Sequence, residues 1–168
     1  KEGGEPSEST AIISKESQYL VDLLYQLTET FHEVLPDKEQ DEPKESLENI
    51  LRTYVTDQVH LNEVPNVLLT SSEKALLMMT LNSLIKNSLQ YEATQIQLSC
   101  YIQPEEYRII VSDNGVGMNK KQLQLYGTAA SGNSLRNSTG LGVFFLKQIL
   151  DIFDWTITAQ SEEGVGTR

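Results

Sequence analysis

The sequence has little cysteine, little positive charge and no long apolar run. Its single cysteine, Cys100, cannot form an internal disulfide, which favours a reducing, cytoplasmic setting. Only 13 residues are lysine or arginine against 24 acidic ones, and this net charge of -11 argues against a nucleic-acid partner. Apolar runs fall far short of the roughly 20 residues that span a bilayer, and no secretory segment opens the chain. The chain suits one compact domain with an appended element.

The acidity is concentrated in residues 1–46, which hold 12 acidic and 4 basic residues. Residues 1–10 are polar and rich in helix breakers, which predicts disorder or a loop. Residues 11–36 are a predicted helix, which Pro36 ends, and residues 37–45 are a predicted charged linker. A heptad stripe on this helix favours either a seam for another helix or packing on its own domain; it comprises Ile13, Leu20, Leu24, Leu27, Phe31 and Val34.

Residues 46–168 alternate between helical and strand patterns. Apolar spacing of three and four residues predicts a short helix from Leu47 to Val55, and an edge strand plus a second short strand are expected between Val59 and Leu69. A capping box at Thr70 to Glu73 opens a long helix that ends near Gln90. The other predicted elements are strands 94–102 and 107–112, a loop over 118–139, a helix from Gly140, and strand 155–159. A further strand is expected beyond residue 168.

Three glycine motifs follow the long helix in order: Asp113–Met118, Thr139–Gly142 and Gly164–Thr167. The first ends an apolar strand, where a carboxylate and two glycines can hold a purine, although Asp-Asn-Gly is also a common hairpin turn. The long helix carries Asn87 in its last turn. An asparagine there either has a hydrogen-bonding partner or is simply exposed.

Together, these motifs resemble the nucleotide-binding domain that sensor histidine kinases share with type II topoisomerases, ninety-kilodalton heat-shock chaperones and mismatch-repair ATPases. The resemblance covers roughly residues 46–168. It implies a two-layer α/β sandwich, in which helices cover one face of a mixed, mostly antiparallel sheet and ATP binds under a lid. It also implies that residues 11–36 are part of a dimerisation helix.

The resemblance also implies roles for individual residues. Asp113 would accept a hydrogen bond from the exocyclic amine of adenine, and Asn87 would bind Mg²⁺. Amides at the start of the last helix would bind the phosphates, and Arg136 would contact them from the lid. The implied ATP-binding set is Asn87, Tyr91, Asp113, Gly115, Gly117, Met118, Thr139, Gly140, Leu141, Gly142 and Thr167.

Ser83 distinguishes between branches of this superfamily. The hydrolytic branches place a glutamate there, one turn before the asparagine, to activate water. Serine lacks that base, which favours a kinase that passes the phosphoryl group to another residue. Histidine kinases commonly carry asparagine at this position and a basic residue before the tyrosine, so Ser83 and Gln90 depart from both patterns.

A histidine kinase needs an acceptor histidine, and the chain contains only His32 and His60. His32 lies at the end of its predicted helix, so we expect the acceptor upstream of Lys1. The resemblance then implies a homodimer that phosphorylates a response regulator receiver domain, with the cytoplasmic fragment joined to a membrane only through segments outside this sequence. Two alternatives stay open: an anti-sigma-type serine kinase of the same fold, and a degenerate nucleotide-binding or dimerisation module without activity.

Overall fold

The computed structural model describes residues 44–104, 106–128 and 141–168. The predicted segments 1–10 and 11–36, and the linker up to residue 43, therefore lie outside the described residues. The same is true of three predicted site residues, namely Arg136, Thr139 and Gly140.

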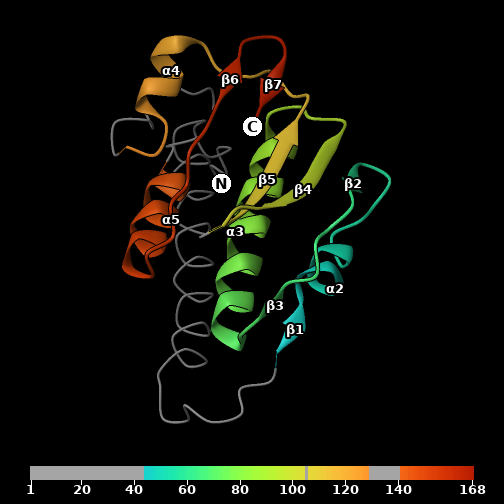
Figure 1. Ribbon diagram of the computed structural model, residues 1–168. Helices are drawn as coiled ribbons and strands as arrows, with labels where there is room; N and C mark the ends of the chain where they lie inside the picture. The colour runs from blue at the N-terminus through green and yellow to red at the C-terminus, as the bar shows by residue number, and fades with distance from the viewer. Residues whose placement is uncertain (1–43, 105, 129–140) are drawn as a thin grey trace, which may run out of the picture.

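A five-stranded sheet in the order β2-β4-β5-β7-β6 forms one layer of the fold (Figure 1). Only the pairing of β2 with β4 is parallel, so the predicted mixed, mostly antiparallel sheet is confirmed. The strands are β2 (Val59–Leu61), β4 (Ile96–Ile102), β5 (Tyr107–Asp113), β6 (Ser161–Glu162) and β7 (Gly166–Thr167). The hairpin predicted between residues 102 and 107 joins β4 to β5.

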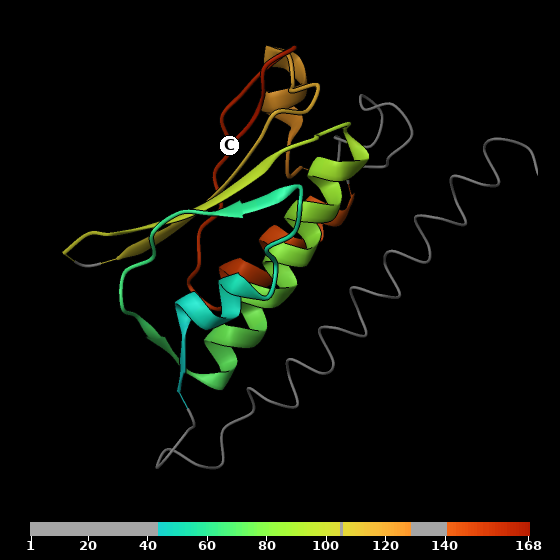
Figure 2. The same cartoon turned by 90° about the vertical axis from the view of Figure 1, so that its right-hand side faces the viewer.

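Three helices, α2 (Leu47–Arg52), α3 (Ser71–Gln90) and α5 (Leu141–Ile152), form the second layer. Figure 2 shows them on one face of the sheet, which confirms the predicted two-layer sandwich. A small antiparallel pair, β1 (Glu45–Ser46) and β3 (Leu68–Leu69), lies beside α2, so Glu45 at the end of the predicted linker is part of a strand. None of the described helices is long and apolar enough to cross a membrane.

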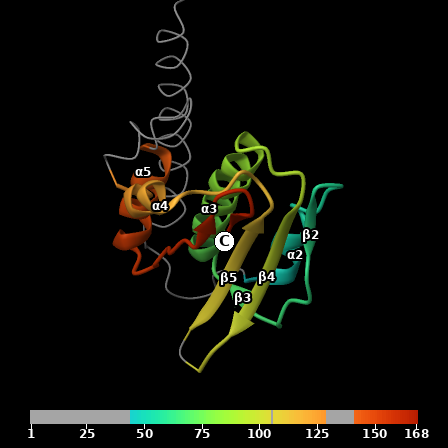
Figure 3. The same ribbon diagram turned by 90° about the horizontal axis from the view of Figure 1, so that it is seen from above.

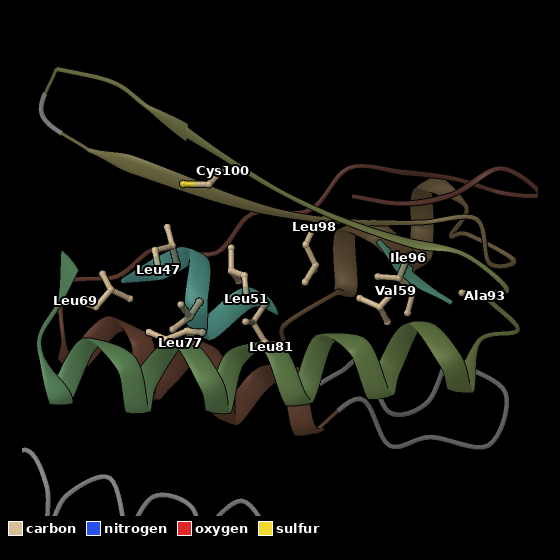
Figure 4. Packing of buried hydrophobic residues seen from close by; sticks show 11 residues of the cluster. Leu47, Leu51, Val59, Leu69, Leu77, Leu81, Ala93, Ile96, Leu98 and Cys100 are labelled. Carbon is tan, nitrogen blue, oxygen red and sulfur yellow. The ribbon is translucent and has the colours of Figure 1, made fainter. Parts of the chain in front are cut away.

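Two apolar clusters hold the layers together. The larger one lies between α2, α3 and the sheet, and its members include Leu47, Leu51, Leu77, Leu81, Ile96 and Leu98, each no more than 1% exposed (Figure 4). The smaller one joins α3 to α5 and consists of Leu76, Met79, Leu146, Ile149 and Leu150. Helix α3 is therefore buried on two sides, which fixes the position of both of its ends relative to the sheet.

The N-terminus of α3 has the predicted capping box. Thr70 Oγ1 accepts a hydrogen bond from the Glu73 amide at 3.3 Å, and Glu73 Oε2 accepts one from the Thr70 amide at 2.8 Å. The second carboxylate oxygen, Oε1, accepts from the Tyr107 hydroxyl at 3.2 Å. Because Tyr107 begins β5, this contact ties the start of that strand to the start of α3.

Burial, with the Glu73 carboxylate nearby, raises the pKa of Tyr107 to about 12. Since this tyrosine ionises more readily in the unfolded chain, near pH 10, its contribution to stability is complete below pH 10 and is lost as the pH rises towards 12. We expect Tyr107→Phe to make the alkaline decline in the free energy of unfolding less steep, as measured by urea denaturation at pH 8 to 11. Burial also raises the pKa of Tyr54 to about 12, so some decline should persist; a variant as pH-sensitive as the wild type would contradict the expectation.

Three local predictions differ from the structure. Helix α2 ends at Arg52, and Val55 is 45% exposed, because Tyr54 already lies in the turn that leads to β2. Residues 155–159 alternate between half-buried and exposed side chains, but no described strand pairs with them, so they are extended without being a strand. The loop predicted over 118–139 contains helix α4 (Lys120–Leu125), which begins with a capping box between Asn119 and Gln122.

Candidate functional site

Asp113 is the last residue of β5 and lies where three segments meet: the C-terminal end of α3, the loop after β5 and the β6–β7 hairpin. It pairs with Ile96 of β4 on one side and with Thr167 of β7 on the other. Viewed from above, α3 runs beside the sheet, and the C-terminus of the chain lies near the end of β5 (Figure 3). A carboxylate that belongs to a strand end is thereby brought against a helix end.

The Asp113 carboxylate accepts three hydrogen bonds. Its Oδ1 accepts from the backbone amides of Gly115 at 2.9 Å and Thr167 at 3.2 Å. Its Oδ2 accepts from the Ser88 hydroxyl at 2.8 Å. These four residues, Ser88, Asp113, Gly115 and Thr167, form what we call the Asp113 cluster. Donors on both of its oxygens hold the plane of the carboxylate in one orientation.

The end of α3 is shaped by a left-handed residue. Glu92 has φ 65°, and the Ala93 amide donates to the Ser88 carbonyl at 3.0 Å, which is the six-to-one bond of a Schellman motif. The Tyr91 carbonyl accepts a hydrogen bond from the Val116 amide at 3.0 Å. The loop after β5 is therefore attached directly to the helix end that carries Ser88.

The glycines of this loop permit close packing of protein backbone. A Cβ at Gly115 would lie 2.5 Å from the Tyr91 carbonyl oxygen, and one at Gly117, where φ is +64°, would lie 1.9 Å from the Glu162 carbonyl oxygen. These contacts show that the two glycines let the loop pack closely against α3 and β6. Their predicted role, which is to make room for a flat ligand, stays a prediction.

A serine from β6 joins the hairpin to this loop. Ser161 Oγ accepts from the Met118 amide at 2.8 Å, donates to the Gly166 carbonyl at 2.8 Å and lies 2.9 Å from Thr167 Oγ1. The Gly164 amide also donates to the Val116 carbonyl at 2.7 Å. Met118, whose amide Ser161 holds, is buried, at 8% exposure.

The alternative that Asp-Asn-Gly forms a hairpin turn is wrong. The Asn114 side-chain oxygen accepts from the amides of Thr94 and Gln95, each at 2.9 Å, so it ties the end of β5 to the approach to β4. The chain then continues into α4 instead of returning as a strand. Asn114 therefore stabilises the strand end that presents Asp113.

The last two turns of α3 hold the other predicted residues of this region. Ser83 is 6% exposed, Asn87 is half-buried, and Tyr91 is the half-buried C-cap residue. Asn87 directly precedes Ser88 in the helix, so their side chains leave the axis about 100° apart. The described residues contain no group of three or more histidine, cysteine, aspartate or glutamate side chains that could hold a metal ion. A hard cation here would need an amide oxygen such as that of Asn87 and oxygens of the nucleotide.

Helix α5 supplies the remaining described residues, Leu141 and Gly142, which are its first two residues. Gly127, after α4, lies near α5, since a Cβ at this glycine would be 3.8 Å from Val143 and 3.6 Å from Lys147.

A separate cavity of about 300 Å³ lies at the opposite end of α3. It contains no predicted site residue and is lined by Lys44, Glu45, Leu69, Thr70, Ser71 and Lys74.

Two site residues were not predicted from the sequence, Ser88 and Ser161. For Ser88 a signal existed, because a serine in the last turn of an apolar helix usually has a hydrogen-bonding partner when it is buried. Ser161 is part of a two-residue strand and has no comparable signal.

Comparison with known proteins gives the family. Residues 72–168, more than half of the chain, match the model described as "Histidine kinase-, DNA gyrase B-, and HSP90-like ATPase". Among curated proteins, the DNA mismatch repair protein MutL of Nostoc punctiforme is 45% identical over 58 residues, which are 34% of this chain and 10% of MutL. The heme sensor protein HssS of Staphylococcus saprophyticus is 25% identical over 114 residues, which are 66% of this chain and 25% of HssS. The chain thus spans only a small part of either relative.

A solved structure agrees on the fold. The ATP-binding domain of PrrB from Mycobacterium tuberculosis superposes with a TM-score of 0.55 at 20% sequence identity, covering 77% of this chain and 93% of that domain. At this identity the match supports the architecture alone.

Proposed function

Because the chain belongs to the histidine kinase-, DNA gyrase B- and HSP90-like ATPase family, we propose that it binds ATP with Mg²⁺ and transfers the γ-phosphoryl group to a histidine outside this sequence. From there the group passes to an aspartate of a response regulator receiver domain. The sequence likeness to the heme sensor protein HssS supports this kinase branch.

The observation that carries the proposal is the Asp113 cluster. A carboxylate at a strand end, held in orientation by three donors, is suited to accept a hydrogen bond from the exocyclic amine of adenine. Guanine presents a carbonyl oxygen at the same position, which a carboxylate repels. Tyr91 would pack on the base. The loop after β5, with Gly115, Gly117 and Met118, would form the floor of the pocket together with Thr167.

Asn87 would bind Mg²⁺ through its side-chain oxygen. The bound metal would neutralise part of the negative charge of the phosphates. The first turn of α5, with Leu141 and Gly142, would direct its free amides towards the phosphates. We propose the same task for Thr139 and Gly140, and a phosphate contact for Arg136.

Ser83 supports transfer over hydrolysis. It is 6% exposed at the position where the hydrolytic branches of the family carry a glutamate. A hydroxyl is too weakly basic at neutral pH to activate water as a carboxylate does, so a bound ATP would persist until an acceptor arrives. We propose that the intact protein is a homodimer that presents such an acceptor histidine. Its cytoplasmic kinase domain would be joined to a sensor in the membrane.

The test is incubation with γ-labelled ATP, Mg²⁺ and a separately supplied dimerisation hairpin that carries the acceptor histidine. We expect acid-labile, alkali-stable label on the hairpin, as phosphohistidine requires, and its loss in Asn87→Ala. Acid-stable label would indicate the serine-kinase alternative, and rapid release of free phosphate would indicate a hydrolase. Bound ATP with neither outcome would mean a degenerate module; each of these three results would refute the proposal.

A further inference from the structure

We propose that Ser88 is a positioning residue for adenine recognition: its hydroxyl holds the Asp113 carboxylate so that Oδ2 has one free lone pair, aimed at an amino group. The inference rests on the proposed contact between Asp113 and the base. It concerns how that contact becomes selective.

The two oxygens of Asp113 have different tasks. A carboxylate oxygen accepts about two hydrogen bonds, and Oδ1 already accepts two backbone amides, from Gly115 and Thr167. Within the part of the chain that the structure describes, Oδ2 accepts only from Ser88. The remaining lone pair of Oδ2 is therefore the position from which Asp113 can contact a ligand.

Ser88 also determines which hydrogen-bonding groups a base would contact beside Asp113 Oδ2. A serine hydroxyl has a single proton, and donating it to Asp113 leaves Ser88 Oγ as an acceptor only. The pair then presents acceptors alone, which suits an amino group and offers no donor to a carbonyl oxygen. Because Ser88 is only 6% exposed, its hydroxyl has almost no solvent to turn towards, and its observed partner is Asp113.

The experiment measures dissociation constants for ATP and for purine riboside triphosphate, which lacks the 6-amino group. For the wild-type chain we expect ATP to bind at least about tenfold tighter, the value of one charge-assisted hydrogen bond. Ser88→Ala should reduce this preference about fivefold, because the carboxylate loses the donor that orients Oδ2. Ser88→Thr, which keeps the hydroxyl, should restore most of it.

Ser99→Ala is the matched control, since it removes the same hydroxyl from a β4 position that is equally buried, at 8% exposure, and outside the cluster. It should leave the preference unchanged. If Ser88→Ala keeps the full wild-type preference, the positioning role is refuted while the adenine contact stands. If the wild-type chain shows no preference for the 6-amino group, the proposed contact of Asp113 itself is refuted. Alanine suits a helix better than serine, so the variant should fold.

Discussion

Asp113→Asn should weaken ATP binding about a hundredfold and leave the fold intact. The side-chain oxygen of asparagine can still accept the amides of Gly115 and Thr167, which fixes the new NH₂ group at the position of Oδ2. In the proposed contact this group would face the exocyclic amine of adenine, so a charge-assisted hydrogen bond would be replaced by two opposed donors. The loss of such a bond and the unpaired donor together correspond to about 3 kcal/mol.

Isothermal titration calorimetry with ATP and with inosine triphosphate tests this result. Inosine carries a carbonyl oxygen in place of the amino group, so the new NH₂ group should favour it, and the ratio of the two affinities should shift towards inosine triphosphate. Thermal melting of the variant without ligand controls for folding. An unchanged affinity for ATP would show that the nucleotide site lies elsewhere.

Gly166→Ala should lower the free energy of unfolding by about 3 kcal/mol. Gly166 has φ +137°, a conformation that is essentially restricted to glycine, and an added Cβ would lie 1.9 Å from the Asp113 carbonyl oxygen. That oxygen belongs to the backbone, so no side-chain rotation relieves the clash and β7 must move away from β5. Urea denaturation measures the loss, and hydrogen exchange at the Thr167 amide should accelerate with it.

Gly164→Ala is the control for this substitution. Gly164 also has a positive φ, of +80°, but an added Cβ would have no atom within 4 Å. Gly164→Ala should therefore lower the free energy of unfolding by only about 1 kcal/mol, the cost of placing a residue with a Cβ in a left-handed backbone conformation. Equal losses in the two variants would mean that the contact between β7 and Asp113 does not stabilise the hairpin.

The sequence predicts the fold well wherever a local pattern and the tertiary environment agree. Helix α3 has both a capping box and apolar residues for two packing surfaces, and β4 and β5 have alternating apolar residues on either side of a short turn. The pattern misleads at residues 155–159, because alternation reports which side chains face inward and not whether a neighbouring strand is present. Helix α4 was missed because its six residues have no apolar periodicity, although Asn119 and Gln122 form a capping pattern.

The sequence motif predicted several residues of the candidate site, but not all of the contacts between them. The motif identified Asp113 and Thr167, which the structure brings into contact, although they lie 54 residues apart. No local rule could predict that Ser88 donates to Asp113, because that contact depends on how α3 packs on the sheet. The reason for Gly115 and Gly117 was also beyond the sequence, since the carbonyl oxygens that exclude a Cβ come from Tyr91 and Glu162.

The Asp113 carboxylate takes two of its three hydrogen bonds from residues 25 positions before it and 54 positions after it. A chain emerging from the ribosome can therefore form α3 and the β4–β5 hairpin early, but it cannot satisfy this carboxylate until Thr167 has been synthesised. Until then the proposed base pocket is incomplete, so we expect that a nascent chain does not bind ATP. Nucleotide binding would then require that synthesis has passed residue 167 and that the β6–β7 hairpin has packed against β5. By mass action it would also stabilise the packed hairpin.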